Sequence, residues 1–509
     1  MKKYLTSVLL LCCLTTSVLA QSPHELSEAP VATTAAEEEQ SEDNQLLTGE
    51  INKQIALEEQ HKTGIYWAAP DYSKQEGVLG WTPNIFDVPP GFRQRVEFWI
   101  DIYSKYSTKQ ALLHDAKYMD IVYKTLDFSD LDGDERAKKK RIKDEKNKIR
   151  EQLTRIQKLQ DNPSKLSEED QIVFKKFRFI TEKNKFSAAS ARNRLRMQLG
   201  QKDRFLLGIY FSGRYIREME KIFREENVPI ELTRLPFVES SFNLYAYSRV
   251  GASGIWQFMR STGKLFKLKI DPIRDLRNDP LTATRAAAKL LASNYRMLGN
   301  WSFALTGYNH GPQGVSRIAK KLQSDDINEI VWNSTGRRFG FASENFYACF
   351  LAALVVEKNA AKYFGKVDIS PPLVYDEIEI PRPLTFPELA YGFKTDSDDG
   401  VERARLYNPY FTRPVLVGAR RIPAENGFKI RIPKGHTEKF LSALKNVEPQ
   451  KALIAVSQGL YKVIPGDTLS SISKDMGVSI QKLLKANNMS RNSVLRPGQK
   501  LVLPTGDER

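Results

Sequence analysis

Residues 236–263 read PFVESSFNLYAYSRVGASGIWQFMRSTG, and this stretch decides how the central part of the chain is interpreted. An apolar segment, residues 230–238, leads to the acid Glu239. Eighteen residues farther along, the amide Gln257 follows a run of small residues. We see no further nucleophile or metal ligand beside these two side chains. The pattern predicts one acid at the end of an apolar segment, followed by a small-residue loop and an amide.

One acid of this kind is suited to breaking a glycosidic bond. Cleavage needs a proton on the leaving oxygen and stabilisation of an oxocarbenium-like centre. A single carboxyl suffices if the substrate brings its own nucleophile, because the same group can act first as acid and then as base. The acid must sit in a poorly hydrated place that raises its pKa. Leu235 to Val238 before Glu239, and Phe242 after it, would supply that place. Taken alone, however, Glu239-Ser240 could equally be an ordinary helix end.

Three further features favour the glycan-cleaving interpretation. The loop from Val250 to Met259 lets backbone approach a sugar, and Gln257 within it offers both a donor and an acceptor. Gly307-Tyr308-Asn309-His310-Gly311 places an aromatic ring and an amide at the end of a predicted helix. Tyr347 lies on a helix that is predicted to start near Glu344.

In order and spacing, these motifs resemble the lysozyme-like family of lytic transglycosylases over roughly residues 200–365. The resemblance implies that Glu239 is the catalytic acid and base, and that Tyr347 forms a hydrogen bond to it. The residues implied to position or bind the glycan are Ser240, Ser248, Gln257, Met259, Tyr308, Asn309 and Tyr347. Two positions depart from the family pattern, since Gly307 replaces a more usual alanine and His310 stands where a small residue is common. We interpret His310 as an added glycan contact or a local structural group.

The resemblance also implies a reaction. The β-1,4 bond between MurNAc and GlcNAc would be cleaved, with the C6 hydroxyl of MurNAc attacking C1 to leave a 1,6-anhydro end. No cofactor or metal is implied. An acidic run at residues 127–135, DFSDLDGDE, has its glycine misplaced for a calcium loop and no closing glutamate, so we interpret it as a turn that starts the next helix.

The C-terminal block resembles a LysM module through YKVIPGDTLSSIS, KLLKANN and LRPGQKLVLP. We place this module at residues 458–504, with a strand at each end and two short helices between. The resemblance implies glycan binding by Gly466, Asp467, Thr468, Leu469, Asn487, Pro497 and Gly498. The alternative is a folding module without affinity for glycan. Residues 372–445 repeat the same order of motifs weakly and are interpreted as a degenerate LysM-like region.

The N-terminus reads as an export signal. Residues 1–20 have two lysines, an apolar run and small residues before a cleavage point at Gln21. Lipidation at Cys12 or Cys13 is the alternative, and it would associate the protein with a membrane. Residues 21–75 are predicted to be an acidic disordered tether. We expect an exported protein of the bacterial periplasm or cell envelope.

Charge and cysteine content narrow the class further. The net charge is +16, and residues 64–509 carry 73 bases against 51 acids, or +22. A strongly basic segment of this kind is suited to binding a polyanionic partner. The export signal and the lack of a base-stacking motif argue against nucleic acid. Cys349 is the one cysteine beyond the signal region, so no internal disulfide is expected. No later segment is long and apolar enough to span a bilayer.

Together these features predict an α+β multidomain protein. A helical N-terminal region at 80–200 precedes a mainly α-helical lysozyme-like catalytic domain at 201–365, and small βααβ modules of LysM type follow it. Within 80–200, residues 134–160 hold eleven bases and five acids on an amphipathic helix. We expect a monomeric peptidoglycan lytic transglycosylase that binds peptidoglycan glycan strands. A goose-type lysozyme-like hydrolase and a catalytically inactive wall-binding protein are the alternatives.

Overall fold

A computed structural model describes most of the chain from Ile85 to Leu503. Its described ranges are 85–131, 133–248, 250–334, 339–395, 400–418, 420–424, 427–447, 460–463, 468–475, 478–490, 493, 495–496 and 499–503. The predicted signal peptide, Cys12, Cys13 and the acidic tether lie outside these residues. The described chain forms two compact units, one up to Met259 together with Ala287–Pro371, and the other made of Arg260–Ala286 and the chain from Pro372 onward. Within these ranges, no helix has the length and apolar character to cross a bilayer.

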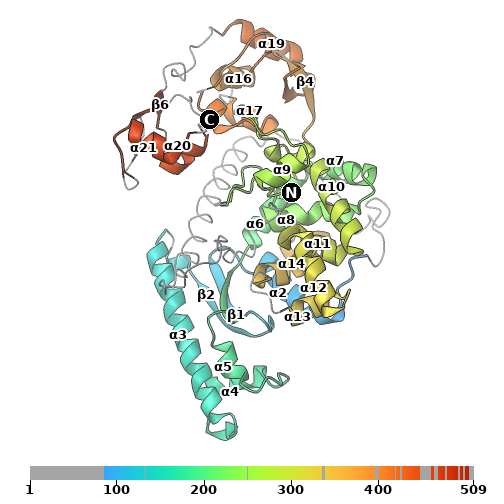
Figure 1. The fold of residues 1–509 in the computed structure, drawn as a ribbon, viewed down its shortest axis with the longest axis vertical. Coiled ribbons are helices and arrows are strands. Elements are labelled where there is room, and N and C mark those ends of the chain that lie inside the picture. Colours follow the sequence, from blue (N-terminus) through green and yellow to red (C-terminus); the bar gives the residue numbers. More distant parts are fainter. Residues whose placement is uncertain are drawn as a thin grey trace. The chain divides into compact units, whose positions relative to one another are not determined.

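The first unit is mainly helical, as predicted (Figure 1). Its N-terminal half holds α2 (Arg93–Ser104), α3 (Glu135–Leu159), α4 (Glu168–Lys176) and α5 (Lys185–Ala189). Its second half holds α6 (Lys202–Ser212), α7 (Ile216–Glu225), the 3-10 helix η5 (Ile230–Arg234), α8 (Leu235–Glu239), α11 (Trp301–His310), α12 (Pro312–Leu322), α13 (Ile327–Asn333), α14 (Phe341–Lys358) and α15 (Ala360–Phe364). The division of the chain into the two units falls within the helix α10 (Pro280–Leu298), after Ala286. Asp279 caps α10 as predicted, because its carboxylate accepts a hydrogen bond from the Thr282 amide at 2.7 Å.

The region predicted as helical at 80–200 also contains a sheet, which the sequence analysis missed. Its strands are β1 (Gln110–Asp115), β2 (Val122–Asp127) and β3 (Leu195–Leu199), in the antiparallel order β2-β1-β3. Strands β1 and β3 pair although the whole α3–α5 segment separates them in sequence. Such short strands carry a weak periodic signal, and their pairing is set by tertiary packing.

The segment between α2 and α6 has a hydrophobic core of its own. The predicted apolar stripe of α3 is confirmed, since Ile149, Leu153 and Ile156 are buried against β1, α4 and α5 and Ile142 packs beside them. Figure 1 shows α4 and α5 next to α3. The acidic turn before α3 is also confirmed as a helix start, because Asp134 accepts a hydrogen bond from the Ala137 amide at 2.9 Å.

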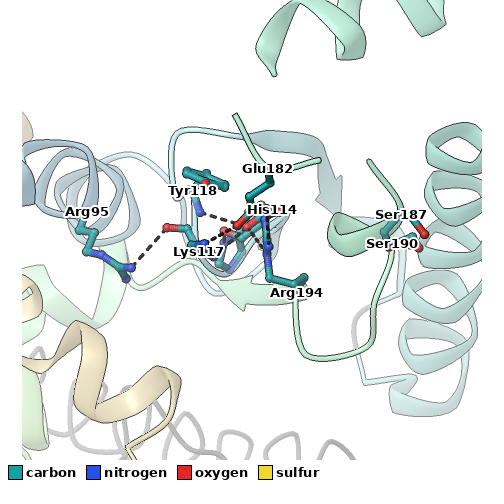
Figure 2. A network of polar contacts seen from close by, with 9 residues as sticks. Arg95, His114, Lys117, Tyr118, Glu182, Ser187, Ser190 and Arg194 are labelled. Carbon is teal, nitrogen blue, oxygen red and sulfur yellow. Dashed lines mark hydrogen bonds and ion pairs between the residues drawn. The ribbon is translucent and has the colours of Figure 1, made fainter. Parts of the chain in front are cut away.

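A buried carboxylate organises the end of β1, in a polar network that includes Lys117, Glu182 and Arg194 (Figure 2). Asp115 is fully buried and accepts hydrogen bonds from the amides of Lys117 and Tyr118, at 2.8 and 3.0 Å. The Arg194 guanidinium bonds both oxygens of Asp115, at 2.9 and 2.8 Å. Glu182 pairs in turn with Arg194 and Lys117. This network holds the turn after β1 against the segment that leads into β3.

The N-terminal half is fastened to α14. The guanidinium of Arg95, on α2, donates to the Asn345 carbonyl oxygen Oδ1 at 3.1 Å and to the Lys117 backbone at 3.3 Å. The Trp99 indole reaches the same Oδ1 at 3.4 Å. Beside them His114 is fully buried, and burial lowers the pKa of its imidazole to about 3, so the ring is neutral. The helix that carries Tyr347 is therefore braced by residues from the region before the predicted catalytic domain.

A buried ion-pair cluster lies directly before α8. Arg234 is 1% exposed and pairs with Glu220 of α7 and, at 3.5 Å, with Glu357 of α14. Its guanidinium also donates to the Thr233 hydroxyl at 2.8 Å. Because paired charges are tolerated inside a protein and unpaired ones are costly, this arginine fixes where α8 begins relative to two neighbouring helices.

The second unit contains two modules in which short helices lie between two paired strands. The first has β4 (Tyr375–Glu379), α16 (Phe386–Gly392), α17 (Val401–Tyr407) and β5 (Lys429–Pro433), with α18 (Arg413–Leu416) before β5 and α19 (Thr437–Lys445) after it. The second has β6 (Leu460–Lys462), α20 (Leu469–Asp475), α21 (Ile480–Ala486) and β7 (Lys500–Val502). In each module the two strands are antiparallel and the helices cover a core of their own. The predicted βααβ fold of the LysM block is confirmed.

The first of these modules is joined to the segment before α10. In addition to α9 (Arg260–Leu265), this segment holds the 3-10 helix η6 (Leu276–Asn278). Arg431 on β5 forms a buried ion pair with Asp279, the cap of α10. The Thr412 amide donates to the Ile273 carbonyl at 3.0 Å, and the Asp275 amide donates to the Tyr410 carbonyl at 2.8 Å. Residues 372–445 are thus built onto the start of α10.

Candidate active site

Glu239 is the last residue of α8, and it is 0% exposed. Neither of its carboxylate oxygens has a hydrogen-bond partner among the described residues. Phe237, Val238 and Phe242 are buried around it in the chain, as the sequence predicted. Burial without a compensating cation raises the pKa of the Glu239 carboxyl well above its usual range. This shift favours the protonated form of the carboxyl, which is the form that a general acid requires.

The chain after Glu239 is held in an unusual backbone conformation. Ser241 and Phe242 have φ angles of 51° and 56°, and Gln257 has a φ of 48°. Residues other than glycine rarely adopt this left-handed region, because each such residue costs about 1–3 kcal/mol and persists only where the surroundings enforce it. Ser240 supplies part of that enforcement, because its hydroxyl donates to the Ile255 carbonyl at 2.9 Å. Ser240 therefore ties the end of α8 to the loop that carries Gln257.

Gln257 presents only an acceptor, which corrects the prediction that it offers both a donor and an acceptor. Its amide nitrogen donates to the Ala246 carbonyl at 3.1 Å and to the Gly254 carbonyl at 2.8 Å. Both amide protons are thus used inside the loop, while Oε1 is buried and has no partner in the described chain. A buried oxygen in this state favours a hydroxyl or another donor from a bound molecule.

Two other predicted residues shape the same loop. Ser248 is buried, and its hydroxyl accepts a hydrogen bond from the Ala252 amide at 2.9 Å. This bond closes the turn around Gly251. Met259, at the end of the loop, is half-buried. Ser248 thus has a structural task, and of the two only Met259 keeps part of its side chain accessible for a ligand.

Tyr308 is brought to the Glu239 loop from α11. Its hydroxyl donates to the Trp256 carbonyl at 2.7 Å, next to Gln257. Burial, and to a smaller degree the charge of Glu239, raise the pKa of the Tyr308 phenol well above its usual range. Tyr308 therefore lies within electrostatic reach of the acid, and it fixes the backbone that precedes the acceptor amide.

Tyr347 is buried on α14, but the expected hydrogen bond from Tyr347 to Glu239 is wrong for this structure. The Tyr347 ring instead packs edge-on against Phe92, with centroids 5.8 Å apart. Burial, with the charge of Asp87, raises the pKa of its phenol. The sequence placed Tyr347 on a helix near the site, but helical spacing alone does not determine where a hydroxyl points.

Asn309 has a partner that the sequence analysis missed. The Ser343 hydroxyl, at the start of α14, donates to Asn309 Oδ1 at 2.7 Å. The same hydroxyl lies 3.3 Å from His310 Nδ1. Ser343 stands one helical turn before Tyr347, and this spacing is the sequence signal that could have drawn attention to it.

The predicted glycan-binding residues of the LysM block are only partly described. Gly466, Asp467, Pro497 and Gly498 lie outside the described residues. Thr468 is exposed, whereas Leu469 is buried in the core of the module. The Asn487 amide is engaged with Leu483 and with both backbone groups of Val502, at 2.6 to 2.8 Å. Asn487 thus uses both of its amide protons to anchor β7 and the end of α21, and its Oδ1 keeps one lone pair.

The geometry defines a class of protein in which a mainly helical domain buries one unpaired acid and a βααβ module follows. Residues 215–331 match the Transglycosylase SLT domain family, and residues 461–504 match the LysM domain family. The family resemblance seen in the motifs is thereby confirmed for these two domains. The chain carries a transglycosylase SLT domain followed by a LysM domain.

Named proteins are similar over part of their length. The chain is 28% identical over 294 residues to the membrane-bound lytic murein transglycosylase D of Escherichia coli K12, covering 56% of this chain and 62% of that protein. The same values hold for the protein of that name from Escherichia coli O6:H1. A putative tributyltin chloride resistance protein of Alteromonas sp. strain M-1 is 36% identical over 110 residues, covering 21% of this chain and 51% of that protein. The chain thus spans less than two thirds of each of these relatives.

Proposed function

We propose that this protein is a peptidoglycan lytic transglycosylase that cleaves the β-1,4 bond between MurNAc and GlcNAc. The observation that carries the proposal is the state of Glu239, which is fully buried and has neither a counter-ion nor a hydrogen bond in the described chain. The SLT and LysM matches and the similarity to lytic murein transglycosylases support the same substrate.

The proposed reaction uses one carboxyl twice. Glu239 is protonated at rest because burial raises its pKa, and it gives this proton to the oxygen of the leaving GlcNAc. The C6 hydroxyl of MurNAc then forms a bond to C1, and its proton passes to the Glu239 carboxylate. The bond from C1 to the leaving oxygen breaks, the new bond to O6 replaces it, and Glu239 regains its starting state. The balance requires no water and no cofactor.

The surrounding residues fit this use of Glu239. The partnerless Gln257 oxygen would accept a hydrogen bond from a sugar hydroxyl. Tyr308 holds the Gln257 loop beside the acid through the Trp256 carbonyl. Both groups are fixed before a ligand arrives, and such preorganisation lowers the cost of reaching the reacting geometry.

The products of murein digestion test the proposal directly. We expect fragments that end in 1,6-anhydro-MurNAc, each lighter by one water than the corresponding hydrolysis product, and mass spectrometry distinguishes the two. Reducing MurNAc ends without anhydro ends would instead assign the protein to the goose-type lysozyme-like hydrolases. Absence of any cleavage would leave an inactive wall-binding protein.

We further propose that the protein acts in the cell envelope and that its LysM module concentrates it on glycan strands. Its βααβ core is a cluster of its own, against which Val417 of the preceding module packs. Removing residues 448–509 is expected to weaken binding to insoluble murein by about 10²-fold, since the module supplies a second attachment point. Cleavage of short soluble glycan fragments should change little. Co-sedimentation with murein measures the loss of binding. If binding to insoluble murein and cleavage of soluble fragments fell equally, the proposed role of the LysM module would be contradicted.

A further inference from the structure

Ser343 is a buried polar residue to which the catalytic scheme gives no task. It is 7% exposed and lies in the first turn of α14. Its hydroxyl is 2.7 Å from Asn309 Oδ1 and 3.3 Å from His310 Nδ1. It therefore joins α14 to the end of α11, where Tyr308 and Asn309 lie.

The direction of each hydrogen bond in this group follows from proton counting. A carbonyl oxygen can only accept, so the one proton of the Ser343 hydroxyl goes to Asn309 Oδ1. Toward His310 the hydroxyl then has only lone pairs to offer, so His310 Nδ1 must carry the hydrogen. His310 Nδ1–H therefore donates to the Ser343 hydroxyl, and the Ser343 hydroxyl donates to Asn309 Oδ1.

The place of His310 is itself enforced. A Cβ on residue 314 of α12 would lie 2.6 and 2.7 Å from two atoms of the His310 imidazole. Only glycine leaves room for the ring there. The ring also packs edge-on against Phe339, with centroids 5.0 Å apart. His310 is thus held where Nδ1 faces Ser343.

This arrangement fixes which end of the Asn309 amide faces outward. With Oδ1 occupied by Ser343, the two protons of Nδ2 remain, and no described residue accepts them. Nor is Nδ2 one of the unpaired side-chain atoms that are sealed from solvent. Asn309 therefore presents donors, whereas Gln257 presents only an acceptor.

We propose that Ser343, oriented by His310, is a positioning residue that holds Asn309 as a hydrogen-bond donor to an N-acetyl carbonyl of the glycan. This inference rests on the proposed function and adds a substrate preference to it. A de-N-acetylated sugar carries an ammonium group in place of the carbonyl acceptor. An ammonium group has no lone pair, so it cannot accept a hydrogen bond from Asn309. The site should therefore prefer N-acetylated glycan, and Ser343 should set part of that preference.

The test measures how strongly N-acetylglucosamine oligomers and glucosamine oligomers inhibit the cleavage of short soluble glycan fragments by the full chain, because this cleavage is not expected to depend on the LysM module. Ser343→Ala is expected to weaken inhibition by the acetylated oligomer about five- to tenfold, the range for one lost hydrogen bond, and to leave inhibition by the glucosamine oligomer unaffected. Ser343→Thr keeps the hydroxyl and should restore the preference. His310→Phe should give a smaller loss of the same kind.

Ser212→Ala is the matched control. Ser212 is also 7% exposed in the same unit, but its hydroxyl donates only to the Ile209 carbonyl of its own helix, at 2.8 Å. It should leave the ratio of the two affinities unchanged. The inference is overturned if both oligomers inhibit Ser343→Ala as they inhibit the wild type, or if the substitution weakens inhibition by both equally. Failure of the proposed function would show separately, as wild-type protein that does not cleave murein.

Discussion

Glu239→Gln is expected to lower murein cleavage by about 10³-fold, the loss typical when a general acid is removed. Glutamine fills nearly the same volume but has no proton to give to the leaving oxygen. Release of soluble muropeptides from purified murein measures the effect. Unchanged release would remove the central residue of the proposed mechanism.

The same substitution is expected to stabilise the protein. The pKa of Glu239 is raised in the folded state above its unfolded value of about 4.3, so the folded state binds the proton more tightly. The contribution of Glu239 to the free energy of unfolding is therefore highest below pH ~4.3 and falls as the pH rises toward its folded pKa. Glu239→Gln lacks this loss, so its melting temperature should exceed that of the wild type by a margin that grows with pH.

Glu344→Gln provides the control for both measurements. Burial raises the pKa of Glu344 as well, but Arg95 and Arg196 oppose the shift. We expect Glu344→Gln to retain murein cleavage. A margin in melting temperature that does not depend on pH in Glu239→Gln would contradict an unpaired carboxyl at position 239.

Arg234→Met is expected to lower the free energy of unfolding by about 3–5 kcal/mol, the usual cost of stranding a buried charge. Glu220 would keep a second contact to Arg224 at 3.5 Å, whereas Glu357 would lose its ion pair. For a unit of this size the loss corresponds to a drop in melting temperature of roughly 6–20 °C. Thermal unfolding followed by circular dichroism measures it.

A compensating variant separates charge from packing. Arg234→Met combined with Glu357→Gln removes the stranded carboxylate and should recover much of the lost stability, because the cost lies in the unpaired charge. If Arg234→Met alone melts within about 2 °C of the wild type, a loss of under 1 kcal/mol, the cluster does not hold α8 in place.

The sequence predicted the features that depend on residues close together along the chain. The cap at Asp279 before Pro280, the apolar stripe of α3 and the acid at the end of α8 each follow from local pattern, and each is present. The sheet of β1, β2 and β3 was missed because its strands meet only through long-range pairing.

In the site, the sequence likewise predicted residue types but not the hydrogen bonds of single atoms. The residue types of Gln257 and Tyr347 were foreseen, but not their bonds. Two backbone carbonyls of the loop take both amide protons of Gln257, and the Tyr347 ring packs on Phe92. Which carbonyl or ring stands next to a side chain is decided by tertiary structure, and no spacing in the sequence encodes it.

The loop from Ala246 to Phe258 closes several polar bonds on itself. Gly254 donates to the Ala246 carbonyl at 2.9 Å, Ser253 donates to the Phe258 carbonyl at 3.1 Å, and the Gln257 side chain bonds both Ala246 and Gly254. The acceptor oxygen is thus placed by bonds within its own segment, and Tyr308 and Ser240 attach that segment to α11 and α8. Destabilising changes that touch neither this loop nor α8 should reduce the number of folded molecules in a sample, while each remaining folded molecule turns over substrate at the wild-type rate.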